Sequence, residues 1–151
     1  MLADKTIHTP IFVKPVCGKL FNGFVYKDDR DLVGRISPGQ DVEVYCSETL
    51  TIKTEWRCFV RYGEILDIRK YKGELGTVYD LAVVKKIVQS YQSAPKAYAL
   101  DIGVTDRGET VIVEMNDGYS LGCYGLDPLL YAKLLSARWA ELTDRADECD
   151  F

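Results

Sequence analysis

Residues 97–116 read AYALDIGVTDRGETVIVEMN, in which two β-rich runs flank the turn residues Asp106-Arg107-Gly108. Successive residues of a strand point to opposite faces of a sheet, and two short β-rich runs around a glycine-containing turn are typical of a hairpin. This stretch therefore predicts two antiparallel strands, at 97–104 and 110–115.

The register of this hairpin decides which polar side chains meet. If Thr105 pairs with Thr110 across the turn, Asp101 comes opposite Glu114. Asn116 lies two residues beyond Glu114 and shares its face of the strand. Two carboxylates and one amide are therefore predicted to converge on one spot.

Opposed carboxylates repel each other, so Asp101 and Glu114 need a cation, a basic side chain or water between them. Magnesium fits this need, because it prefers oxygen ligands and commonly lies between one or two carboxylates and substrate phosphates. The spacing alone also fits a solvated hairpin face whose acids contact only water. Since Asp and Glu are common on hairpins, spacing alone favours that simpler interpretation.

The segments around the hairpin predict an α+β fold, an antiparallel sheet with flanking helices. An N-terminal hairpin is expected, followed by an antiparallel meander and a helix, and a second helix follows the 97–115 hairpin. The predicted strands and helices, in order, are 11–13, 24–27, 42–46, 51–60, 64–70, helix 78–92 with Thr77 and Asp80 as a capping box, and helix 128–143 after the cap Asp127 with Leu130, Leu134, Leu135 and Trp139 inward.

The organisation of the chain predicts one domain over residues 1–151. No internal repeat, low-complexity stretch or interdomain linker interrupts it. We expect the folded core to span residues 11–140 and the acidic tail at 144–151 to be loose.

The composition argues against several classes of protein. The 151 residues carry a net charge of -4, whereas nucleic-acid-binding proteins usually present a basic face. No apolar run approaches the roughly 18 residues of a membrane span, and the N-terminal residues lack a signal-peptide core. We therefore expect a cytoplasmic protein that binds neither nucleic acid nor membrane.

Cysteine and histidine usage argues against two further kinds of site. The five cysteines are scattered and form no CxxC pair, so neither a disulfide framework nor a zinc knuckle is indicated. His8 is the single histidine, which excludes a histidine-clustered zinc site and argues against a Ser-His-Asp triad.

Taken in order along the chain, the motifs resemble those of the ATP-grasp superfamily. In that family an Asp on one strand and a Glu-x-Asn on the next bridge magnesium to nucleotide phosphates, as Asp101 and EMN at 114–116 would here. FVKP at 12–15 resembles the strand that carries a phosphate-binding lysine. TEWRCFV at 54–60 resembles the strand after the adenine hinge, and IRKYKG at 68–73 resembles the next basic strand. The likeness spans residues 11–140 and is nearest to a clade of carboxylate-amine ligase-like proteins.

The resemblance implies ATP and Mg²⁺ as cofactors and assigns a role to each matching residue. It places magnesium on Asp101, Glu114 and Asn116, and phosphate on Lys14 and Lys19. It places adenine along 44–47, chiefly Tyr45 and Ser47, and the ribose near Glu48. Tyr45 and Cys46 could equally belong to an ordinary sheet core.

Arg57 and Arg69 lie on neighbouring predicted strands and are candidates for catalytic residues. A three-residue turn at 61–63 would place Glu55 opposite Arg69 and Arg57 opposite Asp67, and a two-residue turn would shift the register by one. Arginine suits bidentate contact with phosphate or carboxylate, so both residues could hold an acyl phosphate or the γ-phosphate of ATP. The alternative is a cross-strand ladder of salt bridges without a ligand.

The glycine-containing loop at 116–125 is expected to face the acceptor substrate in this family, because glycines let the backbone approach a ligand. The alternative is a plain connection into the last helix. The resemblance implies an ATP-dependent carboxylate-amine ligase that forms amide or peptide bonds through an acyl phosphate. Its substrates would be small-molecule or peptide carboxylates and amines.

Two other functions are kept open. ATP-grasp enzymes usually have a further N-terminal region, which appears absent before the strand that carries Lys14, so we expect self-association or a partner chain to complete the protein. That favours, as the alternative function, a non-catalytic nucleotide-binding or partner-binding module. A nucleotidyl-transfer protein is disfavoured, because KPVCG at 14–18 lacks the KxDG arrangement of lysine-adenylating ligases.

Overall fold

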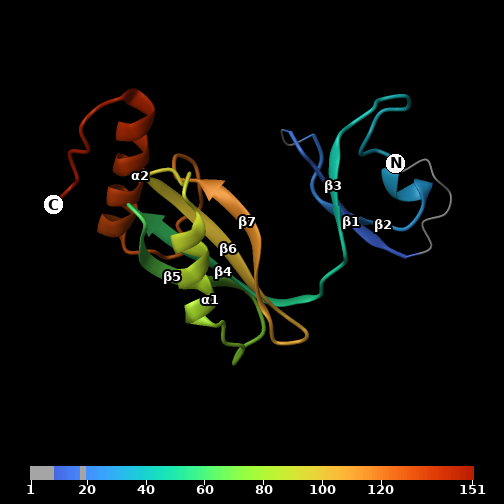
Figure 1. Cartoon of the computed structure of the whole chain (residues 1–151), viewed down its shortest axis with the longest axis horizontal. Coiled ribbons are helices and arrows are strands. Elements are labelled where there is room, and N and C mark those ends of the chain that lie inside the picture. The colour runs from blue at the N-terminus through green and yellow to red at the C-terminus, as the bar shows by residue number, and fades with distance from the viewer. Residues whose placement is uncertain (1–8, 18–19) are drawn as a thin grey trace. The chain divides into compact units, whose positions relative to one another are not determined.

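The structure is a computed structural model that describes residues 9–17 and 20–151 (Figure 1). The chain divides into two compact units, Met1–Leu50 and Thr51–Phe151. The α+β class with antiparallel sheets and flanking helices is confirmed. That the two units together form one domain remains a prediction.

The first unit contains a three-stranded antiparallel sheet in the order β2-β1-β3. Its apolar side chains Val13, Phe24 and Tyr26 pack into a small core. The predicted N-terminal hairpin is confirmed, since β1 pairs with β2. The elements are β1 (Ile11–Pro15), β2 (Phe24–Tyr26), the short 3-10 helix η1 (Asp29–Leu32) and β3 (Val44–Ser47).

The predicted meander from 42 to 70 is wrong in its first strand. β3 pairs with β1, not with the strand that follows it along the chain. Val44 packs against the core of the first unit, so burial of an apolar side chain selects the partner of β3. The alternation of residues along a strand predicts the strand but does not name its neighbour.

The second unit contains a four-stranded antiparallel sheet in the order β5-β4-β6-β7. Every residue of β6 is buried, because β6 lies inside the sheet and both faces are covered. The predicted hairpin at 97–115 is confirmed as β6 and β7. The strands are β4 (Ile52–Arg61), β5 (Glu64–Gly73), β6 (Ala97–Thr105) and β7 (Thr110–Asp117).

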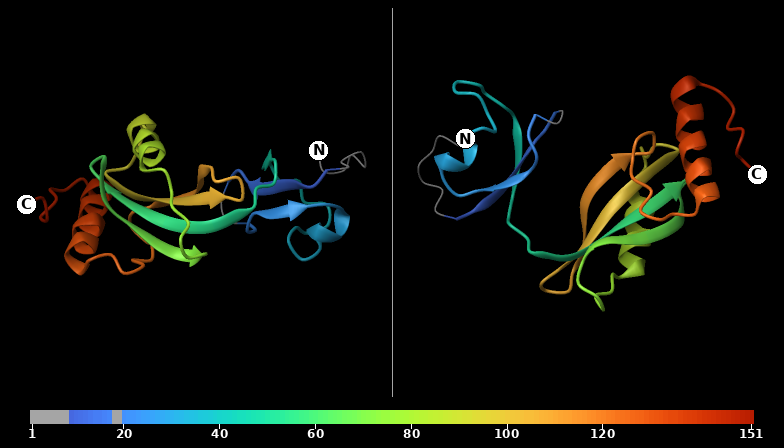
Figure 2. Two further views of the ribbon diagram at one scale, coloured as in Figure 1. Left: turned by 90° about the horizontal axis from the view of Figure 1, so that it is seen from below. Right: turned by 180° about the vertical axis from the view of Figure 1, so that it is seen from behind.

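Helices α1 (Leu81–Ser90) and α2 (Pro128–Thr143) pack on opposite faces of this sheet (Figure 2, left). On the α1 face, Val84 and Val88 pack against the even-numbered side chains of β6, such as Leu100. On the α2 face, Leu134 and Ala137 pack against Ala97 and Ala99. The polar site described below lies on the α2 face, farther along β6.

The start of α1 differs from the prediction. Asp80 is the N-cap, and its carboxylate accepts hydrogen bonds from the N–H groups of Ala82 and Val83. The predicted capping box led by Thr77 is therefore wrong, and Val78 lies outside the helix and is exposed. A carboxylate at N-cap satisfies backbone donors of the first turn, so it outweighs the apolar periodicity that placed the start at 78.

Helix α2 begins at the predicted residue, with Asp127 accepting from the N–H groups of Leu129 and Leu130. The inward position predicted for Trp139 is wrong, because its side chain is 63% exposed. Ala137 and Ala140 are buried instead, and their small side chains let the helix approach the sheet closely. Trp139 is two residues from Ala137, about 200° around the helix, and so faces solvent.

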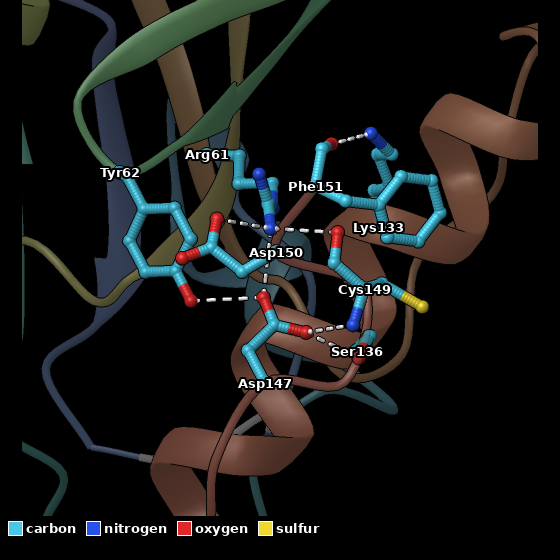
Figure 3. Close-up of polar contacts among 8 residues, drawn as sticks. All are labelled: Arg61, Tyr62, Lys133, Ser136, Asp147, Cys149, Asp150 and Phe151. Carbon is cyan, nitrogen blue, oxygen red and sulfur yellow. Dashed lines mark hydrogen bonds and ion pairs between the residues drawn. The ribbon is translucent and has the colours of Figure 1, made fainter.

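The C-terminal segment, predicted to be loose, is joined to its own unit through Asp147 (Figure 3). The Asp147 carboxylate accepts hydrogen bonds from the Arg61 guanidinium, the Tyr62 hydroxyl and the Ser136 hydroxyl. It also accepts one from the backbone N–H of Cys149. A buried carboxylate with four donors from β4, the following turn, α2 and the tail connects these segments.

No helix in the described part of the chain is long and apolar enough to cross a membrane.

Candidate metal and nucleotide site

Asp101 on β6 lies directly opposite Glu114 on β7, as predicted. The predicted pairing of Thr105 with Thr110 is wrong, since Thr110 pairs with Val104. Val113 is an extra residue on β7, between the partners of Asp101 and Ile102, and this bulge restores the register at the carboxylates. The two acids therefore meet across a bulged part of the hairpin.

A third strand contributes a basic side chain to this spot. Arg57 on β4 is the register partner of Asp101 on its other side. Its Nε and Nη2 donate to the two Asp101 carboxylate oxygens, each at 2.7 Å. The side chains are only 9% and 6% exposed, so this is a buried bidentate ion pair. The hydrogen bonds to Asp101 raise the pKa of the Arg57 guanidinium, although its burial opposes that rise.

Asn116 completes the predicted set, with its Nδ2 donating to Asp101 Oδ2 at 3.1 Å. A carboxylate offers about four acceptor positions, so Asp101 can take a further partner besides Arg57 and Asn116. Glu114, half-buried, adds oxygen donors across the hairpin. Two carboxylates and an amide fit the ligand chemistry of Mg²⁺. Elsewhere in residues 9–17 and 20–151, no group of three or more His, Cys, Asp or Glu side chains is placed to hold a metal.

The register of β4 with β5 follows neither turn that the sequence suggested. The turn has two residues, Tyr62 and Gly63, but Leu66 is an extra residue on β5, so Arg57 lies opposite Arg69. The predicted pairings of Glu55 with Arg69 and of Arg57 with Asp67 are therefore wrong. A bulge adds a residue to one strand only, and no turn signal reveals it.

The two arginines have different partners. Arg57 pairs with Asp101, whereas Arg69 Nη2 lies 2.6 Å from Asp67, two residues away on the same strand. The Arg69 side chain is 43% exposed, and its buried Nε has no hydrogen-bond partner among the described residues. Opposed guanidinium groups repel, so each turning to its own carboxylate relieves that repulsion.

An aromatic pair covers Arg57 from the loop that follows β7. The Tyr124 ring lies 4.8 Å from the Arg57 guanidinium carbon and stacks on Tyr71, with ring centroids 4.8 Å apart. Tyr124 has φ of 43°, a left-handed conformation that is uncommon for an aromatic residue. The Arg57 Nη1 also donates to the Gly122 carbonyl at 3.4 Å. The loop at 116–125 is therefore attached to the Arg57 side chain.

Glu55 supports the aromatic pair from below. It is 8% exposed, and its carboxylate accepts from the Tyr71 hydroxyl at 2.8 Å and from Lys72 Nζ at 2.5 Å. Tyr71 is a second extra residue on β5, between the partners of Trp56 and Glu55, and bulges re-aim side chains in this way. Burial and the hydrogen bond to Glu55 raise the pKa of Tyr71. Sequence reasoning missed the roles of Tyr71 and Tyr124, since their contacts join segments far apart in the chain.

The predicted nucleotide residues of the first unit lie on one face of its sheet. Lys14 is the register partner of Tyr45, and Ser47 lies two residues along the same strand. Tyr45 is 64% exposed, so it does not belong to a sheet core. Glu48 follows the end of β3, and its carbonyl accepts from the Ser47 hydroxyl. Lys19 lies outside the described residues.

An antiparallel sheet between two helices, with an Asp on one strand and a Glu-x-Asn on the next, defines the ATP-grasp class of protein. The chain belongs to an ATP-grasp domain family, described as family 2 of its clade, whose sequence model matches residues 2–134.

Solved structures of ATP-grasp proteins are similar to this chain in fold. N5-carboxyaminoimidazole synthetase from Staphylococcus aureus has a TM-score of 0.60 at 12% identity, over 96% of this chain and 43% of that one. The ATP-grasp ligase PsnB, complexed with a phosphomimetic variant of a minimal precursor, Mg and ADP, has a TM-score of 0.50 at 19% identity, over 73% of this chain and 37% of that one. This chain thus spans about two fifths of the length of these enzymes. No curated protein matches its sequence.

Proposed function

We propose that this chain carries the magnesium-binding part, and residues of the nucleotide-binding part, of an ATP-dependent carboxylate-amine ligase. One observation carries the proposal: Asp101 and Glu114 are opposed across β6 and β7, and Asn116 contacts Asp101, in a chain of the ATP-grasp family. Two buried or half-buried acids facing each other are unfavourable without positive charge, so the arrangement suits a bound cation.

Asp101, Glu114 and Asn116 would hold Mg²⁺ through their oxygen atoms. Magnesium bound there would neutralise charge on the ATP phosphates. Lys14 and Lys19 would donate to phosphate, while Tyr45 and Ser47 would contact the adenine and Glu48 the ribose. The complex of PsnB with Mg and ADP supports this assignment, as a property of a protein with the same fold.

Arg57 and Arg69 would act on the anionic part of the reaction. A guanidinium has more N–H donors than the contacts described above use, so both residues could still donate to a phosphate or an acyl phosphate. The reaction proposed is phosphorylation of a substrate carboxylate by ATP, followed by attack of an amine that expels phosphate and forms an amide. The protein would contribute positioning and charge neutralisation, with no protein nucleophile.

Calorimetric titration with ATP in the presence of magnesium tests the proposed site. We expect binding to the wild-type chain and loss of most of that binding in Asp101→Asn and in Glu114→Gln. Lys133→Gln, on α2 and away from the site, is the matched control and should bind as the wild type does. A folded wild-type chain that does not bind ATP with magnesium would contradict the proposal.

A second candidate is a nucleotide-binding or partner-binding module without turnover. The bidentate engagement of Arg57 with Asp101 favours it, because a catalytic arginine is then occupied by a structural partner. The two candidates differ in ADP release. Magnesium-dependent ATP binding without ADP release, over a panel of amino acids and peptides, would favour the module.

A further inference from the structure

The charges around Asp101 nearly balance before any ligand binds. Arg57 supplies one positive charge against the two carboxylates Asp101 and Glu114, which leaves a single net negative charge in the metal-binding set. The neighbouring ion pairs, Arg69 with Asp67 and Lys72 with Glu55, are each balanced within themselves. The set therefore offers a free dication much less charge than two unpaired carboxylates would.

We propose that Arg57 is a built-in counter-ion of Asp101, so that a divalent cation binds this set only together with nucleotide phosphates. The inference rests on the proposed function and concerns the order in which the ligands of that site bind. Magnesium gives up its hydration shell reluctantly, and one net negative charge is poor compensation for that cost. The phosphates of a nucleotide bring the additional negative charge that both the dication and Arg57 require.

Several contacts prevent Arg57 from leaving Asp101 when a cation approaches. Both carboxylate oxygens hold it, the Gly122 carbonyl accepts from its third nitrogen, and the Tyr124 ring lies over the guanidinium. Tyr124 is in turn stacked on Tyr71, whose hydroxyl is held by Glu55. Arg57 is therefore a fixed charge of the site and not a side chain that can swing into solvent.

The site also favours the anion that the cation must accompany. Arg57 retains N–H donors that the described contacts do not use, and the raised guanidinium pKa keeps its charge present at any working pH. A phosphate approaching the Asp101 and Glu114 set would meet a positive charge, and a free cation would meet the same charge as repulsion. One residue thus discriminates between a free cation and its nucleotide complex.

The test titrates the chain with Mn²⁺ alone, as a magnetic substitute for Mg²⁺, at about pH 8, where ordinary carboxylates are ionised. Free Mn²⁺ is counted by electron paramagnetic resonance. We expect little binding to the wild type and at least ~10-fold tighter binding to Arg57→Gln, because removing a unit charge a few ångströms from a dication is worth at least that factor. Arg57→Lys keeps the charge and should resemble the wild type.

Two further variants locate the gained ion. The double variant Arg57→Gln/Asp101→Asn should lose the gain in Mn²⁺ affinity, and retention of the gain would overturn the proposal. If Arg57→Gln does not fold, the wild type and Glu114→Gln decide the matter. Tight binding of Mn²⁺ alone to the wild type that Glu114→Gln weakens would overturn the proposal, whereas weak binding unchanged by Glu114→Gln would support it.

A parallel titration with ADP and Mn²⁺ separates this inference from the proposed function. Binding of the metal-nucleotide complex to the wild type, without a gain in Mn²⁺ affinity in Arg57→Gln, would overturn the counter-ion role alone. Absence of binding of the complex to the folded wild type would contradict the nucleotide site itself.

Discussion

The Arg57 guanidinium on β4 and the Asp101 carboxylate on β6 are register partners joined by two hydrogen bonds of 2.7 Å. Both side chains are buried, so neither can be hydrated if the other is lost. Removing one partner of a buried ion pair leaves an uncompensated charge, which costs more than the pair contributes. The pair is thus a stability element as well as part of the proposed site.

Asp101→Asn should accordingly lower the free energy of unfolding by about 3–5 kcal/mol, because the Arg57 charge would remain buried without a carboxylate. Glu114→Gln is the matched control on the opposite strand. Since Glu114 is only half-buried, its substitution should cost less than about 1.5 kcal/mol. Urea denaturation followed by circular dichroism measures both values, and equal losses in the two variants would contradict the burial argument.

The Tyr124 ring should matter through its two faces and not through its hydroxyl. Tyr124→Phe keeps the contact with Arg57 and the stack on Tyr71, so we expect unfolding within about 0.5 kcal/mol of the wild type. Tyr124→Ala removes both contacts and should cost about 1–2 kcal/mol. Thermal unfolding compares the two variants. If Phe destabilises the chain as much as Ala does, the ring contacts are not the source of the effect.

Asp147 should make the stability of the chain fall in acid. Its burial alone would raise the pKa of the carboxyl, but the hydrogen bonds from Ser136, Arg61, the Cys149 N–H and Tyr62 outweigh burial and hold the pKa well below its ordinary value. A group whose pKa is lower in the folded state stabilises that state above the unfolded pKa. The stabilisation is therefore fully present above about pH 5 and is lost as the pH falls through the ordinary Asp range toward the folded pKa.

Asp147→Asn removes this dependence and is the variant that tests it. Its free energy of unfolding should lie about 1–3 kcal/mol below that of the wild type at pH 7, and the difference should shrink as the pH falls below 5. Asp150→Asn is the control, because the Asp150 side chain is 66% exposed although it also contacts Arg61. A difference between Asp147→Asn and the wild type that stays constant from about pH 7 to pH 3 would refute the assignment.

Gly118 and Gly122 lie in the same loop but differ in the space around them. A Cβ at Gly118 would lie 2.4 Å from the carbonyl oxygen of Ala97, whereas at Gly122 the nearest atom would be a ring carbon of Tyr124 at 3.5 Å. Gly118→Ala should therefore destabilise the fold by about 1–3 kcal/mol, since the backbone of β6 cannot move aside. Gly122→Ala should change it by less than about 0.5 kcal/mol. Chemical denaturation of both variants checks the contrast, and similar losses would contradict it.

Local sequence patterns were sufficient for the elements that position the site. Alternation around Asp106-Arg107-Gly108 predicted the hairpin and placed Asp101 opposite Glu114, and the Asp127-Pro128 cap predicted the start of α2. These signals act within a few residues, because side-chain alternation and N-cap hydrogen bonds are properties of the local backbone. The family motifs, which follow one another in order along the chain, could also be found in the sequence.

Packing between distant segments decided the rest. Burial of Val44 made β1 the partner of β3, and the extra residues Leu66 and Tyr71 on β5 set the register of Arg57 and turned Tyr71 toward Glu55. Trp139 faces solvent because small alanines let α2 approach the sheet.

The sequence by itself determined which strands, helices and metal-ligand side chains this protein has, since these depend on period, caps and motif order. The tertiary structure alone decided that Arg57 lies on Asp101 beneath Tyr124, because a bulge and a buried ion pair depend on residues more than forty positions apart in the chain.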